Sequence, residues 1–230
     1  MFLSLDFIHQ CPNYLKLLGP FVPFGSPGAK TSLKNVAALG ANFVSIIVTR
    51  FQHFFNSTKI FAHPGLTADD RDLRAQIRYA RHRLGLKVML KLQIDALCST
   101  NTTSRLPHAD ESAACGLESG RNTSCGTWRG CIGQPNAPLP ALNATQVSAW
   151  FRSYQASLLH YATMAAEEGV EQLSVGCELQ GLIGYASQWR RVIASVRSAL
   201  PSSTILTYSA NWGGDETSIT WYWDHVFCCL

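Results

Sequence analysis

Apolar positions along the chain follow two alternating patterns. Four segments carry apolar residues at helical spacing, and each is followed by a glycine or a proline: 31–39, 67–84, 145–168 and 187–200. Between them lie short runs rich in Val, Ile and Leu, at 42–49, 86–95, 170–178 and 204–211, and a further run begins at 224. The pattern predicts helices that alternate with strands. Thr67-Ala-Asp-Asp70 also predicts a capping box at the start of the second helix.

Helical crossovers of this length predict parallel strands, because parallel neighbours cannot be joined by tight turns. The fold class is therefore α/β. A doubly wound sheet is disfavoured, since the sequence has no G-x-G-x-x-G or P-loop pattern. A TIM barrel carries its functional loops after the strands, and the long segment 96–144 follows a predicted strand directly. We expect one domain over 1–230, a partial (β/α)8 barrel with about five to six strands and with 96–144 as a loop inserted after the third strand.

The composition fits a single globular domain and narrows the function classes. The chain has 230 residues, 47% of them apolar, which is enough to bury a core. Its net charge is +4, and the densest basic stretch, 71–83, is interleaved with aspartates, so we interpret it as a solvated helix face and expect no nucleic acid. No apolar run reaches the roughly 18 residues of a membrane span. Metal-binding histidine spacings and a G-x-S-x-G motif are absent, and we expect no metal and no cofactor.

Glycosylation motifs and cysteines favour an oxidising compartment. Asn-X-Ser/Thr patterns begin at Asn56, Asn101, Asn122 and Asn143. Four of the eight cysteines lie in one loop-like stretch, which favours disulfide bonds: Cys98, Cys115, Cys125 and Cys131. A zinc site is the alternative, although no two of these cysteines have the spacing of a zinc knuckle. We expect a secreted glycoprotein, although the first residues do not form a clear signal peptide because they lack a basic start and contain Asp6.

Strand parity gathers polar side chains at one end of the predicted barrel, because alternate residues of a strand point to opposite faces. The expected inward set is Lys91, Gln93, Asp95, Ser174, Gly176, Glu178, Thr207, Ser209 and Asn211, whereas Cys177 is expected to face the helices. Glu178 ends an apolar strand, where TIM barrels keep catalytic residues. Each residue of this rim can alternatively be a hydrogen-bonded structural group; for Glu178 we favour catalysis.

Several blocks of sequence, in order, resemble glycoside hydrolase family 113. They are Ser32-Leu-Lys-Asn-Val-Ala-Ala-Leu-Gly-Ala-Asn-Phe-Val, Gly85-Leu-Lys-Val-Met-Leu-Lys91, Trp128-Arg-Gly130, Val175-Gly-Cys-Glu-Leu179 and Thr207-Tyr-Ser-Ala-Asn-Trp212. The resemblance runs from about Phe24 to Leu230. It implies a TIM barrel of clan A, with retaining β-mannanase as the known activity of the family.

The resemblance implies that Glu178 is the acid/base glutamate after the fourth strand, which makes 42–49 the second strand. The implied reaction is retaining hydrolysis of O-glycosidic bonds by two carboxylates about 5–5.5 Å apart. The family's nucleophile is a glutamate after the seventh strand, and this chain ends in the sixth, so we expect a truncated glycosidase without its nucleophile. Asp95 is a further candidate for that role. A glycan-binding barrel without catalysis and a non-functional fragment are the alternatives.

The resemblance also implies residues that hold the substrate, a β-mannan or a related oligosaccharide. Lys91 and Asp95 match the third-strand motif, in which Leu92 and Gln93 replace the expected Pro and His. Aromatic rings can stack on apolar sugar faces, and polar groups can hold sugar hydroxyls. The candidate substrate-binding set is Lys91, Gln93, Asp95, Trp128, Arg129, Asn211 and Trp212.

Overall fold

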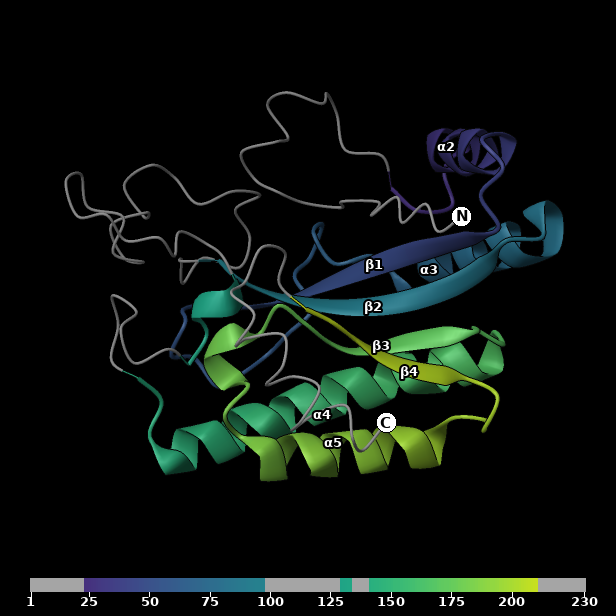
Figure 1. Cartoon of the computed structure of the whole chain (residues 1–230). Helices are drawn as coiled ribbons and strands as arrows, with labels where there is room; N and C mark the ends of the chain where they lie inside the picture. Colours follow the sequence, from purple (N-terminus) through teal and green to yellow (C-terminus); the bar gives the residue numbers. More distant parts are fainter. Residues whose placement is uncertain (1–22, 98–128, 134–140, 211–230) are drawn as a thin grey trace.

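The computed structural model describes residues 23–97, 129–133 and 141–210, which form a parallel sheet with helices around it (Figure 1). The strands are β1 (Phe43–Gln52), β2 (Lys87–Ala96), β3 (Gln172–Cys177) and β4 (Ile205–Ser209), in the spatial order β1-β2-β3-β4. The helices are α2 (Pro27–Ala38), α3 (Asp70–Arg78), α4 (Ala144–Glu167) and α5 (Ala186–Ala199). Shorter turns are the π-helix η1 (Tyr79–Arg83) and the 3-10 helices η3 (Arg129–Cys131) and η4 (Gln180–Leu182). The predicted strand at 224–230 lies outside these residues.

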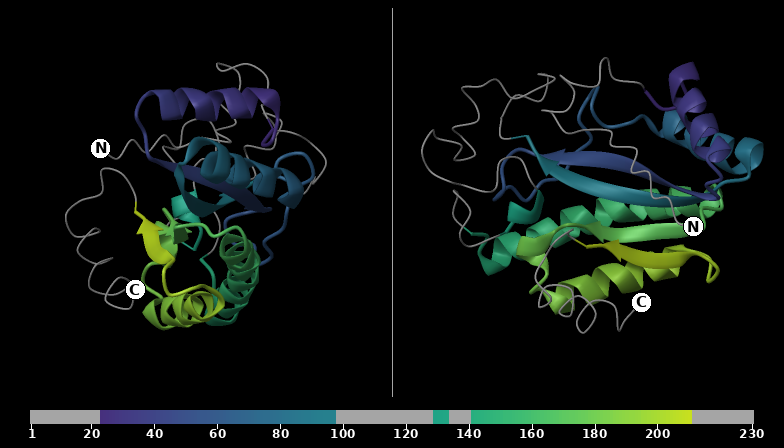
Figure 2. Two further views of the ribbon diagram at one scale, coloured as in Figure 1. Left: turned by 90° about the vertical axis from the view of Figure 1, so that its right-hand side faces the viewer. Right: turned by 45° about the horizontal axis from the view of Figure 1, so that its top comes forward.

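The sheet curves, and its helices lie around the outside of the curve (Figure 2). β1 and β2 pair in parallel over their full length, from Phe43 opposite Lys87 to Gln52 opposite Ala96. Each following strand also pairs in parallel with the one before it, and each is reached through a helix. This is the arrangement of a TIM barrel, and the described strands make part of one.

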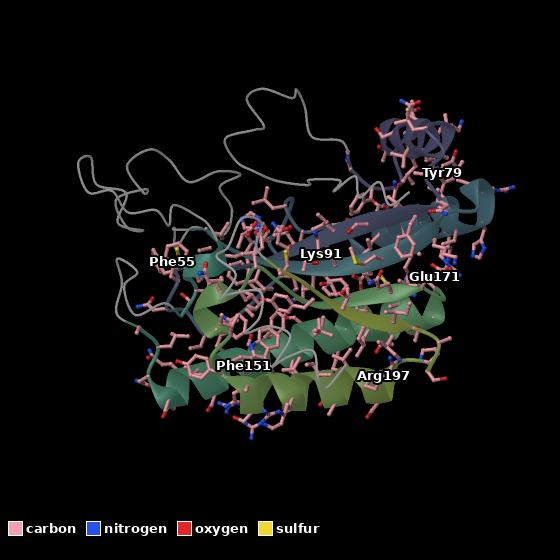
Figure 3. All side chains as sticks on the ribbon, viewed as in Figure 1. Phe55, Tyr79, Lys91, Phe151, Glu171 and Arg197 are labelled. Atoms are coloured by element: carbon pink, nitrogen blue, oxygen red, sulfur yellow. The ribbon has the colours of Figure 1, made fainter. Side chains whose placement is uncertain are left out.

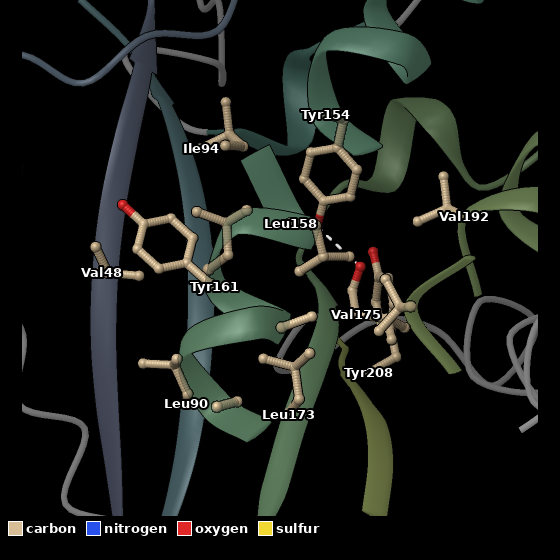
Figure 4. Packing of buried hydrophobic residues seen from close by; sticks show 14 of the residues in the cluster. Val48, Leu90, Ile94, Tyr154, Leu158, Tyr161, Leu173, Val175, Val192 and Tyr208 are labelled. Atoms are coloured by element: carbon tan, nitrogen blue, oxygen red, sulfur yellow. Dashed lines mark hydrogen bonds between the residues drawn. The ribbon is translucent and has the colours of Figure 1, made fainter. Parts of the chain in front are cut away.

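The hydrophobic core fills the space between the outer face of the sheet and the helices. Alternate β1 and β2 residues, such as Val48 and Leu90, are buried there together with Leu158 and Tyr161 of α4 (Figure 4). The large aromatic residues keep hydrogen bonds inside this core, as buried polar groups must. The Tyr154 hydroxyl donates to the carbonyl of Val175 at 2.9 Å, and burial raises the pKa of that hydroxyl.

The helix starts differ from one another in a way that the sequence only partly predicts. α4 begins with a complete capping box, in which Asn143 accepts from the amide of Gln146 and the Gln146 side chain accepts from the amide of Asn143. The capping box predicted at Thr67 is wrong: α3 has Asp69 as its N-cap, without a side-chain cap bond. The Thr67 hydroxyl is used elsewhere, because it accepts from the amide of His63 and donates to the Thr49 carbonyl of β1.

An ion-pair network joins the start of the sheet to its helices. Glu168, with a side chain that is 4% exposed, accepts from Arg74 and Arg78 of α3. Arg81 donates to Glu171, which also accepts from the amide of Val88 near the start of β2 (Figure 3). Burial alone would raise the pKa of Glu168, but the hydrogen bonds from the two arginines hold it below its ordinary value. This network fastens α3 and η1 to the end of α4.

None of the described helices combines the length and apolarity that a membrane crossing requires.

Candidate active site

Glu178 stands directly after β3, in a backbone conformation that L-residues rarely adopt. Its φ is +50°, and it is the one non-glycine residue with positive φ among the residues that the structure describes. A left-handed conformation costs a residue with a Cβ about 1–2 kcal/mol. The neighbouring strand holds it there, because the Glu178 amide donates to the Ser209 carbonyl at 2.9 Å. Such strain persists only where the surroundings impose it, and it clusters at functional sites.

A register shift between β3 and β4 causes this conformation. Ser174 pairs with Thr207, but Cys177 pairs with Ser209, so β3 has one residue more than β4 over this stretch. An extra residue of this kind is a β-bulge, which bends the strand and redirects the side chains that follow. The Ser174 hydroxyl stabilises the bulge by donating to the Gly176 carbonyl at 2.7 Å, and it lies 3.0 Å from the Ser209 hydroxyl.

The bulge corrects one prediction from strand parity. Gly176 was expected to point inward, but a Cβ there would clash with the ring of Tyr208 and lie 3.1 Å from Trp189 of α5, so this position faces the helices. Cys177 was expected to face the helices, and it lies near both Tyr154 of α4 and the charges of the rim. Burial raises the pKa of Cys177 to about 11, while the positive charges of Arg129 and Lys91 oppose the rise. Simple alternation therefore fails at Gly176.

Arg129 of η3 connects two of the predicted site carboxylates. Its Nη1 donates to Glu178 Oε2 at 2.5 Å, and its Nε and Nη2 lie 3.0 and 2.9 Å from Asp95 Oδ1. The Arg129 and Asp95 side chains are only 13% and 12% exposed, whereas that of Glu178 is 29% exposed. Burial lowers the pKa of Arg129, but the charges of Asp95 and Glu178 outweigh this effect and raise it, so the guanidinium stays charged.

The remaining strand residues complete the inner face of β2. Lys91 and Gln93 are both buried, and Lys91 lies between Ile47 of β1 and Ser174 of β3 in the sheet (Figure 3). Gln93 donates to the second oxygen of Asp95 at 3.2 Å. The structure thus brings together Gln93, Asp95, Arg129 and Glu178, with Lys91 on the same strand as Asp95. Trp128, Asn211 and Trp212 lie outside the described residues.

Two residues at this site were not found by sequence reasoning. The hydroxyl of Tyr208 accepts from the amide of Leu179 at 2.9 Å and so fixes the backbone just after Glu178. Cys177 lies among the rim charges. Gly176 was the sequence feature that could have indicated the irregular strand end, because an isolated glycine within a strand pattern indicates a bulge or a close approach of the backbone.

The rim shows no cluster suited to a metal ion. Across residues 23–97, 129–133 and 141–210, no group of three or more His, Cys, Asp or Glu side chains is placed to bind one. What the described residues of the rim offer is a carboxylate at the end of a strand, held by an arginine. Carboxylates at this end of a barrel serve acid and base catalysis in TIM-barrel enzymes.

The fold and the rim define a partial TIM barrel of the glycoside hydrolase type. The sequence model of Glycoside Hydrolase Family 113 matches residues 19–105 and 117–229, and the chain belongs to this family.

Solved structures of the same family share the fold. A GH113 β-1,4-mannanase is 25% identical with a TM-score of 0.63, over 87% of this chain and 54% of that one. The β-mannanase of Alicyclobacillus acidocaldarius, in complex with ManMIm, is 27% identical with a TM-score of 0.62, over 90% of this chain and 56% of that one. This chain therefore spans little more than half the length of these structures. A comparison with curated proteins found no match.

Proposed function

We propose that this chain carries the acid/base half of a retaining glycoside hydrolase active site, with Glu178 as the acid/base. The observation that carries the proposal is the left-handed backbone of Glu178, which directs a carboxylate toward Arg129 and Asp95 at the carboxyl ends of the strands. β-1,4-Linked mannan is the proposed substrate, because the similar structures are described as β-mannanases.

In the proposed reaction Glu178 acts twice. As a carboxylic acid it protonates the departing glycosidic oxygen while a nucleophilic carboxylate bonds to the anomeric carbon. The resulting Glu178 carboxylate then takes a proton from the water that displaces the nucleophile and releases the sugar. Arg129 donates to Glu178 Oε2 and so holds the carboxylate in place for both steps. Asp95 pairs with the same guanidinium and fixes its position.

We propose that the nucleophile is the glutamate after the seventh strand that the family resemblance implies, which is not one of the residues described above. Asp95 is poorly placed for that role, because its two oxygens accept from Arg129 and Gln93. The guanidinium of Arg129 also bridges it to Glu178, and the bridge neutralises the charge that a nucleophile must use. Lys91 and Gln93 line the inner face of β2 next to this pair and are the proposed contacts for sugar hydroxyls.

The test is hydrolysis of β-1,4-manno-oligosaccharides by the natural protein, compared with Glu178→Gln. Loss of the acid/base is expected to lower kcat by about 10²–10⁴-fold, with little change in stability. Glu167→Gln is the matched control, because Glu167 is a solvent-exposed carboxylate on α4. Equal turnover by Glu178→Gln would remove Glu178 from the mechanism. Oligosaccharide binding without hydrolysis by the folded natural protein would instead identify a glycan-binding barrel without catalysis.

We further propose that the protein passes through the secretory pathway and carries glycans and disulfides. Asn56 and Asn143 are the acceptor asparagines of two of the glycosylation motifs, and neither residue is buried. Treatment of the protein from its natural source with an N-glycan-cleaving enzyme is expected to increase its electrophoretic mobility. Unchanged mobility would contradict the glycosylation.

A further inference from the structure

A groove lined by basic residues lies between α2 and the segment made of α3 and η1. Its volume is about 290 Å³, and we call it the α2–η1 groove. Its lining consists of Lys30, Ala75, Arg78, Tyr79, His82 and Arg83. The five residues on the α3–η1 side recur at spacings of three and four positions, so they form one face of that segment. All six lining residues lie on helices, and none belongs to the rim that holds Glu178.

The charged part of this lining is entirely basic. Ala75 and Tyr79 are uncharged, and the other lining residues are Lys, Arg or His. Arg78 also pairs with Glu168, but its side chain remains 60% exposed. Among the described residues, Lys30, His82 and Arg83 have no carboxylate partner. The groove therefore presents positive charge without an acidic residue of its own.

The basic stretch 71–83 divides into two parts in the folded chain. Sequence spacing alone indicates a solvated helix face, because aspartates are interleaved with the arginines. Its arginines at the first four positions pair with nearby carboxylates: Arg71, Arg74, Arg78 and Arg81. Its last two residues, His82 and Arg83, instead line the groove together with Lys30 of α2. The positive charge that is left over is thus gathered in one place.

Helix stability does not account for this arrangement. Lys30 occupies the first turn of α2, where the helix dipole disfavours a positive charge, and that turn holds no acidic residue. Its Nζ lies 5.7 Å from the centre of the Tyr79 ring, so the ammonium group is held beside η1 (Figure 3). η1 is a π-helix, a rare turn that recurs at functional sites. Like charges on two facing elements repel each other, and an anion bound between them relieves the repulsion.

The charge and the size of the groove restrict the ligand. Arginine and lysine form short, charge-assisted hydrogen bonds with oxyanions, and the planar guanidinium matches two oxygens at once. Several positive groups favour a divalent anion over a monovalent one, because the Coulomb energy grows with the charge. A volume of about 290 Å³ lies at the lower end of the range for small-molecule sites, so the bound group is small.

We propose that the α2–η1 groove binds a divalent oxyanion, phosphate or sulfate, through Lys30 and Arg83, with Arg78 and His82 beside them. The oxyanion is either the free ion or a group on a larger molecule, whose remainder can rest on Ala75 and Tyr79. The proposal goes beyond the glycosidase site, because it uses no residue of the rim.

The test titrates the natural protein with sodium phosphate and with sodium sulfate, and sodium chloride keeps the ionic strength constant. The His82 ring resonances, followed by NMR, report on the groove itself, and His82→Gln assigns them. Calorimetry gives the dissociation constants. Arg83→Gln is expected to weaken binding about tenfold and Lys30→Gln about fivefold, since each removes one charge-assisted hydrogen bond.

The matched controls remove the same charges elsewhere. Lys34→Gln changes an exposed lysine one turn further along α2, and Arg190→Gln changes an exposed arginine on α5; neither residue lines the groove. Both controls are expected to bind as the natural protein does. Equal affinities in Arg83→Gln and Arg190→Gln, or in Lys30→Gln and Lys34→Gln, would overturn the proposal.

The expected result is a saturable shift of the His82 resonances with phosphate or with sulfate. A shift of the same size with sodium chloride alone would overturn the proposal, because it would reflect only screening of surface charge. Titration with a sulfated disaccharide then distinguishes the two sources of the oxyanion. Tighter binding than that of free sulfate would support a group on a larger molecule, and equal binding would support the free ion.

Discussion

The two ends of the sheet both pair arginines with carboxylates, but they do so in different ways. At the start of the strands, Arg74 and Arg78 converge on Glu168, and Arg81 holds Glu171. At the ends of the strands, one guanidinium is shared by Asp95 and Glu178. Glu168 thus has two arginine partners and Glu171 has one, whereas Asp95 and Glu178 share a single arginine.

The backbone differs between the two ends as well. Glu168 ends α4 with a helical φ of −89°, whereas Glu178 has a φ of +50°. The side chain of Glu168 is almost fully covered, while that of Glu178 remains partly open to solvent. The comparison teaches that ion pairing alone does not identify a functional carboxylate in this fold. Strain, partial exposure and a shared counter-charge distinguish the end that we assign to chemistry from the end that supports stability, as is general for TIM barrels.

The largest expected effect is a contrast between two variants: Glu178→Gln should lose activity but keep its stability, and Glu168→Gln should lose stability but keep its activity. We expect Glu178→Gln to lower kcat on manno-oligosaccharides by about 10²–10⁴-fold at nearly unchanged Tm. We expect Glu168→Gln to lower Tm by about 2–4 °C at nearly unchanged kcat. Parallel melting curves and initial rates measure both. Loss of activity in Glu168→Gln without unfolding would break the distinction between the two ends.

The bulge before Glu178 provides the next test. Gly176→Ala places a Cβ against Tyr208 and Trp189 and is expected to lower the free energy of unfolding by about 1–3 kcal/mol. Gly184→Ala is the control, since its Cβ would meet no atom within 4 Å and its φ is not positive. Urea unfolding of both variants measures the difference. Similar stability of the two would show that β3 does not bulge as described.

Acid titration examines the opposite end of the sheet. The pKa of Glu168 and Glu171 is lowered in the folded protein from an ordinary value of 4.5, because hydrogen bonds from arginines outweigh the effect of burial. A carboxylate with a lowered pKa adds stability that is present above its unfolded pKa and is lost as the pH falls through its folded pKa. We therefore expect stability to fall as the pH is lowered below about 4.5, with a smaller slope in Glu168→Gln than in Glu167→Gln. An equal slope in both variants would contradict this origin.

The smallest expected effect isolates the backbone strain at Glu178. Glu178→Gly and Glu178→Ala both remove the carboxylate, and they differ only in tolerance of positive φ. Glycine is normally less stable than alanine, but here we expect Glu178→Gly to be more stable than Glu178→Ala by about 1 kcal/mol. Urea unfolding of the pair gives the sign directly. The normal order would show that Glu178 is not strained.

Much of the fold could be predicted from apolar spacing, because helix and strand periods are set locally. Lys91, Gln93 and Asp95 lie along one regular strand, and alternation placed them correctly on one face. Gly176 was placed wrongly, because a bulge depends on the pairing of β3 with β4 and not on β3 alone. Thr67 was misjudged for the same reason, since its hydroxyl bonds to a strand 18 residues away in sequence instead of its own helix.

The resemblance to the family supplied what spacing could not. No local pattern indicates that Arg129 reaches both Asp95 and Glu178, which are 34 and 49 residues away along the chain. The family block Trp128-Arg-Gly130 predicted a role for that arginine, but as a substrate contact and not as a bridge between two carboxylates. Side-chain pairs of this kind require the folded sheet.

The hydrogen bond that the Glu178 amide donates to the Ser209 carbonyl has a consequence for how this scaffold can diversify. The position of Glu178 is fixed by the end of β4, a strand that follows it in sequence, and by Tyr208 through Leu179. These hydrogen bonds do not involve the segment between Leu179 and α5. Within this segment Leu182 is buried and accepts a hydrogen bond from Trp189, whereas Gly184 is exposed. Gly184 is therefore the natural point for laboratory grafting of a new loop beside a carboxylate that keeps its place.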